Sequence, residues 1–244
     1  TIIGVGVFGI PYTFAAAGVS IGTAWFLILA LAILVIHMYF TEIVLATKEK
    51  RRLVGYAKKY LGKKAAAATT VCAILSFYGA IVVYIIVGGE FLYNLFGNIL
   101  GGGVMVYQIV FFVFTAIFIA LGLKLVSKVE SVLTALLILT MLVISAAAFW
   151  GGDGANFTAP NWLEFFLPYG IIFFALTGSN AIPEMKDIVG GDARALRRSV
   201  VIGTVVASVL TFIFTLAVVA VSGILTSPEA LKGLGEFLGP KILI

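Results

Sequence analysis

The chain has 244 residues, of which 62% are hydrophobic and only 11% are charged, and its formal net charge is +5. A soluble domain is about half apolar and a quarter charged, so the composition excludes a water-soluble domain, and a disordered chain would be poorer in apolar residues. An integral membrane protein remains, and at about 35 residues per span the length predicts about seven transmembrane helices.

Seven apolar segments follow one another along the chain. None alternates polar with apolar residues, which excludes the strands of a membrane β-barrel and leaves helices as the spanning structure. The sequence therefore predicts an all-α integral membrane fold. The seven predicted spans are residues 1–18, 21–46, 65–96, 104–123, 129–150, 165–185 and 200–223.

Basic residues gather in three of the connections between these spans. Residues 47–64, 124–128 and 186–199 hold 14 of the 16 lysines and arginines. These stretches follow spans 2, 4 and 6, so they lie on one side, which the positive-inside rule assigns to the cytoplasm. Connections 97–103 and 151–164 carry no Lys or Arg and are expected outside. We therefore expect an integral protein of the plasma (inner) membrane. Its basic residues are expected to lie at the lipid surface on the cytoplasmic side and not to bind nucleic acid.

Spans 1 and 6 each contain a glycine- and proline-rich run that favours a break in the helix. Gly6 precedes Pro11 by five residues and Gly178 precedes Pro183 by five, and each proline follows an isoleucine. Glycine lowers helix stability and proline removes a backbone donor. Because five spans separate the two runs, the second crosses the membrane in the opposite direction. This pattern is typical of inverted-repeat transporters, although Gly and Pro also form packing kinks in membrane helices.

A broken helix in a membrane exposes backbone groups that can bind a ligand. The freed N–H groups at a helix start attract an anion, and the freed carbonyls at a helix end attract a cation or an ammonium group. A zwitterion fits both.

The residues of the two breaks resemble those of a known superfamily. The run from Thr1 to Pro11 is similar to the first-span signature of amino-acid permeases of the amino acid–polyamine–organocation superfamily. The run from Phe173 to Glu184 resembles their second broken helix, and Arg197-Arg198-Ser199 resembles the start of their seventh span. The most similar branches are the amino acid/auxin and the aromatic amino-acid permeases.

The resemblance implies a five-plus-five inverted-repeat fold with broken helices 1 and 6. Residues 1–150 would form the first repeat and residues 151–244 the start of the second. The chain opens with Thr1 inside an apolar segment, so we expect an N- and C-terminally truncated fragment that does not transport alone.

The resemblance also implies a binding site. The substrate carboxylate would rest on the backbone N–H groups of Gly4, Val5, Gly6 and Val7. The amino group would meet backbone carbonyls at the second break, from Phe174, Ala175, Leu176 and Thr177 to Gly178. Gly9, Pro11 and Pro183 would act as hinges. The small polar residues from Thr177 to Asn180 argue against an aromatic substrate.

Four further residues have two possible roles each, and a fifth, Glu42, has one expected role. His37, in span 2, is a proton relay or a neutral histidine bonded to a neighbouring helix. Tyr84 covers the substrate or belongs to a packing stripe. Glu90 and Glu184 serve in a gate or in an interfacial salt bridge, and Glu42 is expected to pair with a Lys or Arg.

We therefore expect a secondary-active amino-acid transporter that works by alternating access. A transporter for a nucleobase or an inorganic ion is the alternative. One histidine and one cysteine, Cys72, argue against an enzyme and against a metal site, and no cofactor is expected. The coupling ion, H⁺ or Na⁺, the amino acid and the oligomeric state stay open.

Overall fold

The computed structural model describes residues 3–121 and 123–228, and within them every regular element is an α-helix or a short 3-10 helix. Four of the described helices are long and apolar enough to cross a membrane. They are α2 (Val19–Ala46), α3 (Leu53–Leu100), α5 (Leu123–Gly151) and α8 (Ala193–Ser222). Two further apolar helices, α1 (Gly6–Ala17) and α4 (Val104–Ala120), are shorter. The count of seven spans therefore stays a prediction.

Several helices begin earlier than the sequence suggested. Helix α3 begins at Leu53, so residues 47–52 alone form the non-helical part of the predicted connection 47–64. Helix α5 begins at Leu123, which places Lys124 and Lys128 within a helix and not in a connection. Propensity explains both differences, because Lys and Leu are good helix formers that do not end a helix.

Helix α3 contains a sharp bend at Gly62. Its φ of 85° and ψ of −177° are non-helical, so residues 53–61 and 63–100 form two helices in different directions. A φ in this region suits glycine, which has no Cβ to clash with the backbone. The basic segment 53–61 is thereby turned away from the long apolar segment.

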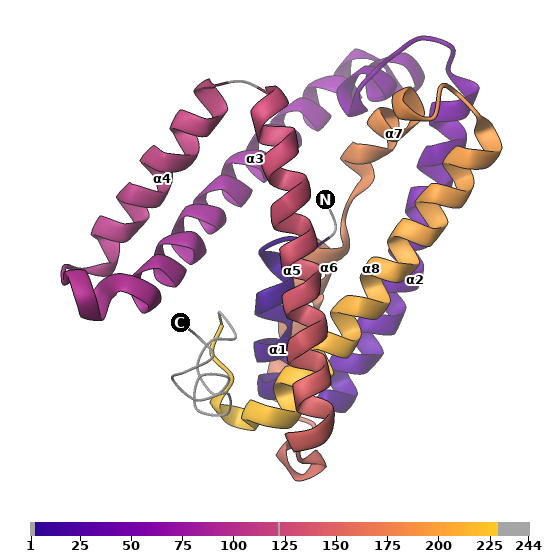
Figure 1. The fold of residues 1–244 in the computed structure, drawn as a ribbon. Helices are drawn as coiled ribbons and strands as arrows, with labels where there is room; N and C mark the ends of the chain where they lie inside the picture. Colours follow the sequence, from indigo (N-terminus) through magenta and orange to yellow (C-terminus); the bar gives the residue numbers. More distant parts are fainter. Residues whose placement is uncertain (1–2, 122, 229–244) are drawn as a thin grey trace.

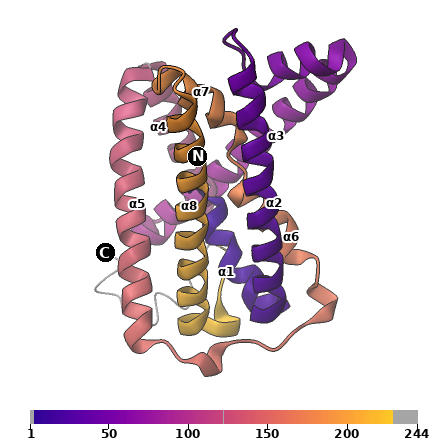
Figure 2. The ribbon, with the colours of Figure 1, turned by 90° about the vertical axis from the view of Figure 1, so that its right-hand side faces the viewer.

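Helix α1 lies at the centre of the packed part of the molecule, among α2, α5, α6 (Leu167–Leu176) and α8 (Figures 1 and 2). Its Phe14 is fully buried, and its ring lies where a side chain on α2 would stand if Gly22 were any other residue. The main apolar core therefore joins helices from both halves of the chain, through Ile10, Phe14, Phe26, Leu29, Ile33, Ile172, Ala175, Leu176 and Val219.

Helices α3 and α4 form an antiparallel hairpin that stands to one side of this core (Figure 1). They approach closely where Gly88 meets the ring of Phe111 and Gly89 meets Gln108. Most of their apolar side chains are exposed, as expected for surfaces that lipid covers.

The segment between α5 and α6 covers the end of α1. It contains two 3-10 helices, η1 (Gly154–Asn156) and η2 (Trp162–Glu164). The hydroxyl of Thr158 donates to the carbonyl of Phe14, and the N–H of Asn161 donates to the carbonyl of Ala17. Carbonyl groups at a helix end need such partners. The loop thus seals this end of α1.

The basic stretches of the chain gather at the opposite end of the molecule. The 47–52 loop, the start of α5 and the connection between α7 (Ile182–Ile188) and α8 lie together there, at the top of Figure 1. The segment 152–166 lies at the other end, whereas loop 101–103, at the tip of the α3–α4 hairpin, lies to one side between the two ends (Figure 1). The assignment of the basic connections to the cytoplasmic side stays a prediction.

Candidate functional site

The predicted break in the sixth apolar segment is present. Helix α6 ends at Leu176, and Thr177 and Gly178 are non-helical. A 3-10 helix, η3 (Ser179–Ala181), leads into α7, whose first turn contains Pro183, a position where proline is tolerated because the missing N–H needs no partner. The carbonyl of Phe173 accepts from both the N–H and the hydroxyl of Thr177. The carbonyls that follow it belong to the last turn of α6, where a helix offers them no partner of its own.

The first break is shorter than the sequence suggested. Residues 3–5 are non-helical, but α1 begins at Gly6 and runs through Gly9 and Pro11, so no break lies at those two residues. Thr1 and Ile2, which open the quoted motif, lie outside the described residues. The N–H of Val7, expected to hold a carboxylate, donates to the carbonyl of Gly4 in this structure.

The two breaks lie side by side. A Cβ atom added at Gly6 would stand 2.9 Å from the Cβ of Ala175 and 3.1 Å from the Cδ1 of Phe174. Residues from the two motifs are therefore in contact, as a common site requires. The contact also gives Gly6 a packing role that sequence reasoning missed, because the space expected for a ligand is filled by Ala175.

Tyr84 of α3 reaches the first break from outside the core. Its Oη lies 2.9 Å from where a Cβ atom on Gly4 would stand. One turn further along α1, the ring of Phe8 meets the rings of Phe91 and Phe214 edge to face, with centroids 5.4 and 6.1 Å apart. Aromatic side chains from α3 and α8 thus border the start of α1.

His37 connects the second break to two long helices. Its side chain is 2% exposed. The backbone N–H of Gly178 donates to Nε2 at 3.2 Å, and Nδ1 lies 3.0 Å from the Oγ1 of Thr204 on α8. A backbone N–H can only donate, so Nε2 is unprotonated and the neutral ring carries its proton on Nδ1, which donates to Thr204. His37 therefore acts here as a bonded neutral histidine.

A cavity of about 220 Å³ lies next to both breaks. Its walls come from the chain before α1, from the second break and from α2, α5, α7 and α8. They include Ile3, His37, Thr134, Gly178, Ser199 and Thr204. The cavity combines a mostly apolar wall with the polar groups of the second break.

Glu42 pairs with a base, as expected, but the partner lies on α8 and not in the neighbouring loop. Its two carboxylate oxygens accept from the Nε and Nη2 of Arg197 at 2.6 and 2.8 Å. Glu184 is exposed in the first turn of α7, and Glu90 lies within α3. Neither position decides between a gate and a salt bridge.

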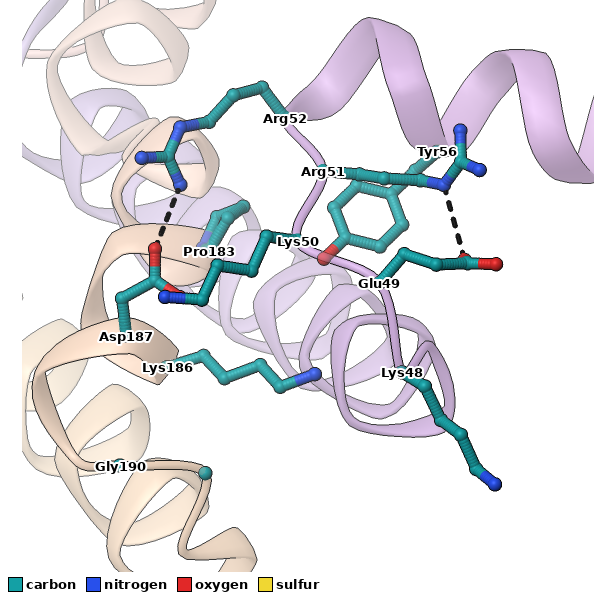
Figure 3. Close-up of a pocket in the computed structure, with 11 residues that line it drawn as sticks. Lys48, Glu49, Lys50, Arg51, Arg52, Tyr56, Pro183, Lys186, Asp187 and Gly190 are labelled. Carbon is teal, nitrogen blue, oxygen red and sulfur yellow. Dashed lines mark hydrogen bonds and ion pairs between the residues drawn. The ribbon is translucent and has the colours of Figure 1, made fainter.

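The loop after α2 is fastened to α7 around a second cavity of about 260 Å³ (Figure 3). The carboxylate of Asp187 lies 3.4 Å from Lys50 and 3.6 Å from Arg52. On the other side, a hydrogen bond from Lys59 and a further one from Arg51 hold the pKa of Glu49 below its ordinary value. The loop is thus held by ion pairs at the basic end of the molecule.

Comparisons with known proteins identify relatives. The tryptophan/tyrosine permease family matches residues 1–232. Over 240 residues the chain is 27% identical to "Tyrosine-specific transport system 1" of Haemophilus influenzae, which covers 97% of this chain and 58% of that protein. The chain therefore spans less than two thirds of the length of this relative. No solved structure matches the chain.

Proposed function

The chain belongs to the tryptophan/tyrosine permease family, and we propose that it contributes the substrate site of a secondary-active transporter for an aromatic amino acid. The family and the relative support an integral membrane protein that transports amino acids rather than an enzyme. They also favour amino acids over the alternative substrates, a nucleobase or an inorganic ion.

One observation carries the proposed site: α1 begins where α6 ends. The first N–H groups of a helix have no partner within it and carry the positive end of the helix dipole, whereas the last carbonyls carry the negative end. Side by side at Gly6 and Ala175, these ends suit the carboxylate and the ammonium group of one amino acid. The N–H groups of Gly4, Val5 and Gly6 would hold the carboxylate, and the carbonyls from Phe174 to Gly178 the ammonium group.

The side chain of the substrate would enter the 220 Å³ cavity. Sequence reasoning argued against an aromatic substrate because residues 177–180 are small and polar. The family favours such a substrate, and small residues at the break leave room for a ring that larger ones would fill. The apolar lining, from Ile3, Ile182, Met185 and Ala207, suits an aromatic ring. Tyr84 would cover the substrate from the other side.

We further propose alternating access in a five-plus-five inverted-repeat fold, with residues 1–150 as the first repeat and residue 151 onward as part of the second. The basic end would face the cytoplasm. The loop that seals α1 then lies outside, whereas the cavity beside Gly178 lies toward the cytoplasm, so this structure would represent an inward-facing state. Pro183 would serve as a hinge between α6 and α7.

Competition for uptake tests the proposal. The full-length protein is reconstituted in proteoliposomes with labelled tyrosine, and unlabelled tyrosine, tryptophan, tyrosinamide and leucine are added in turn. We expect tyrosine and tryptophan to compete strongly. Tyrosinamide should compete weakly because it lacks the carboxylate that the start of α1 attracts. Equal competition by tyrosinamide would place the site elsewhere, and equal competition by leucine would rule out an aromatic preference.

A further inference from the structure

We propose that His37 is a positioning residue that holds the α6–α7 break in place while its ring is neutral and releases the break when the ring is protonated. The inference concerns the same site as the proposed transport function, and its effect on transport rests on that function. We call the hydrogen bond between His37 and Gly178 the latch. Its existence rests on the contacts of His37 and not on transport.

Both ring nitrogens are engaged, and their partners belong to different elements. Nε2 accepts from the N–H of Gly178, which belongs to the break, whereas Nδ1 faces Thr204, which belongs to the long helix α8. His37 itself stands on α2. One imidazole therefore ties the break between α6 and α7 to the two long helices α2 and α8.

Protonation changes one of these bonds and leaves the other. The added proton takes the lone pair of Nε2, which accepts from Gly178 in the neutral ring. Imidazolium has two N–H donors and no acceptor, so Nδ1–H can still donate to Thr204 while Nε2–H faces the N–H of Gly178. Two donors that face each other in a buried site are destabilising. The break must therefore move away from the ring to remove this conflict.

No Asp, Glu, Lys or Arg side chain lines this cavity among the described residues. Among the described residues that line the cavity, His37 is the only one whose side chain changes charge in the ordinary pH range. Helices α1 and α6 carry only Tyr12 and Tyr169. The charged groups on α2, α7, α5 and α8 are Glu42, Glu184, Lys186, Asp187, Lys124, Lys128, Glu130, Arg194, Arg197 and Arg198. Glu42 is already paired with Arg197.

The cavity gives the latch a direction. His37 and Gly178 form part of one wall, and Ser199 lies on another. Movement of Gly178 away from the ring widens the space between these walls. A reagent that approaches from the basic end should then reach residue 199 more readily.

Two substitutions separate the two bonds of the ring. In His37→Gln, the side-chain oxygen lies near the position of Nε2 and can accept from Gly178, but the amide does not titrate in this pH range. In His37→Asn, the shorter amide can replace only the nitrogen that faces Thr204. The latch should therefore be permanently closed in the first variant and permanently open in the second.

The test measures how fast a thiol at residue 199 is labelled. Ser199→Cys is introduced into the full-length protein in a Cys72→Ala background, with His37, His37→Gln or His37→Asn. Labelling is followed between about pH 5 and pH 8, the range in which histidine changes charge. Each rate is divided by that of a Lys48→Cys reporter, which lies in the exposed 47–52 loop and reports the ionisation of the thiol itself.

We expect the ratio to rise at least about threefold toward low pH with His37, to stay low with His37→Gln and to stay high with His37→Asn. The same pH dependence in all three proteins would overturn the latch, and so would a low ratio in His37→Asn. No substrate is present, so these results do not depend on transport. Failure of tyrosine uptake would reject the proposed function and leave the latch standing.

Discussion

The Nζ of Lys186 lies 2.8 Å from the carbonyl oxygen of Val44, and this bond joins the short helix α7 to the last turn of α2. The same ammonium group donates to the carbonyl of Thr47 at 2.7 Å. A cation at a helix end satisfies its last carbonyls and interacts favourably with the helix dipole. The segment beyond the second break is therefore anchored at both of its ends, by Lys186 here and by His37 at Gly178.

Substitution of Lys186 should loosen α7. Lys186→Met keeps the length of the side chain but removes both hydrogen bonds, and we expect the protein to lose about 1–3 kcal/mol of stability. The melting temperature in detergent checks this. Lys48→Met is the matched control, because Lys48 is an exposed lysine next to Thr47 and makes no ion pair among the described residues. An equal fall in both variants would contradict a specific role for Lys186.

The contact between Gly6 and Ala175 predicts that a substitution at Ala175 can partly restore what a substitution at Gly6 impairs. Gly6→Ala places a Cβ atom 2.9 Å from that of Ala175, so we expect a lower melting temperature and weaker uptake. Gly6→Ala combined with Ala175→Gly removes the facing methyl group and should recover part of both. Gly170→Ala in α6 is the control, because a Cβ atom there meets nothing within 4 Å. No recovery in the double variant would mean that Gly6 leaves space for a ligand rather than for α6.

The hydroxyl group of Tyr84 is expected to matter for binding rather than for folding. If Tyr84 covers the substrate, Tyr84→Phe should raise the KM for tyrosine uptake about threefold to tenfold, the value of one hydrogen bond. The melting temperature should not change. Tyr78→Phe, on an exposed part of the same helix, should leave both unchanged. A fall in stability without a change in KM would assign Tyr84 to helix packing.

The orientation of the molecule in the membrane can be tested with two cysteines. The background must be Cys72→Ala, because Cys72 is a free, exposed thiol. We expect Lys58→Cys to react only with an impermeant reagent on the cytoplasmic side and Gly103→Cys only with one outside. Gly103 is preferable to Gly102, whose φ of 90° would strain a cysteine. Reversed labelling would invert the assignment of sides, and with it the inward-facing interpretation.

Local signals made parts of this structure predictable from the sequence. Gly178 and Pro183 lower helix stability close together, and the helix does break between them. The prediction of a break at Pro11 was wrong. The proline ring disfavours a helix, but buried contacts on several sides hold α1, and the helix continues through Pro11.

Contacts across long stretches of sequence were not predictable in the same way. The partner of His37 in the break is a backbone N–H, which every residue except proline has, so no residue type marks it. The packing of Gly6 on Ala175 depends on how close two helices come, which a single sequence does not indicate. Glu42 was expected to form an ion pair with a Lys or Arg. The sequence contains many basic side chains near it, and only the packing of α2 on α8 shows that the partner is Arg197.

Because α3 bends at Gly62, a small rotation at this residue would displace the far end of the helix by a large distance. Residues 63–100 extend about 57 Å at the usual rise of a helix, and they carry α4 with them. A rotation of about 5° at this single residue would displace the far end by about 5 Å, roughly one helical turn. The pivot lies beside the basic segment, whereas the loop at the tip, residues 101–103, lies far from it at the side of the molecule (Figure 1). A small change in backbone angle near the lysines would thus produce a large sideways displacement of the distant tip of the hairpin.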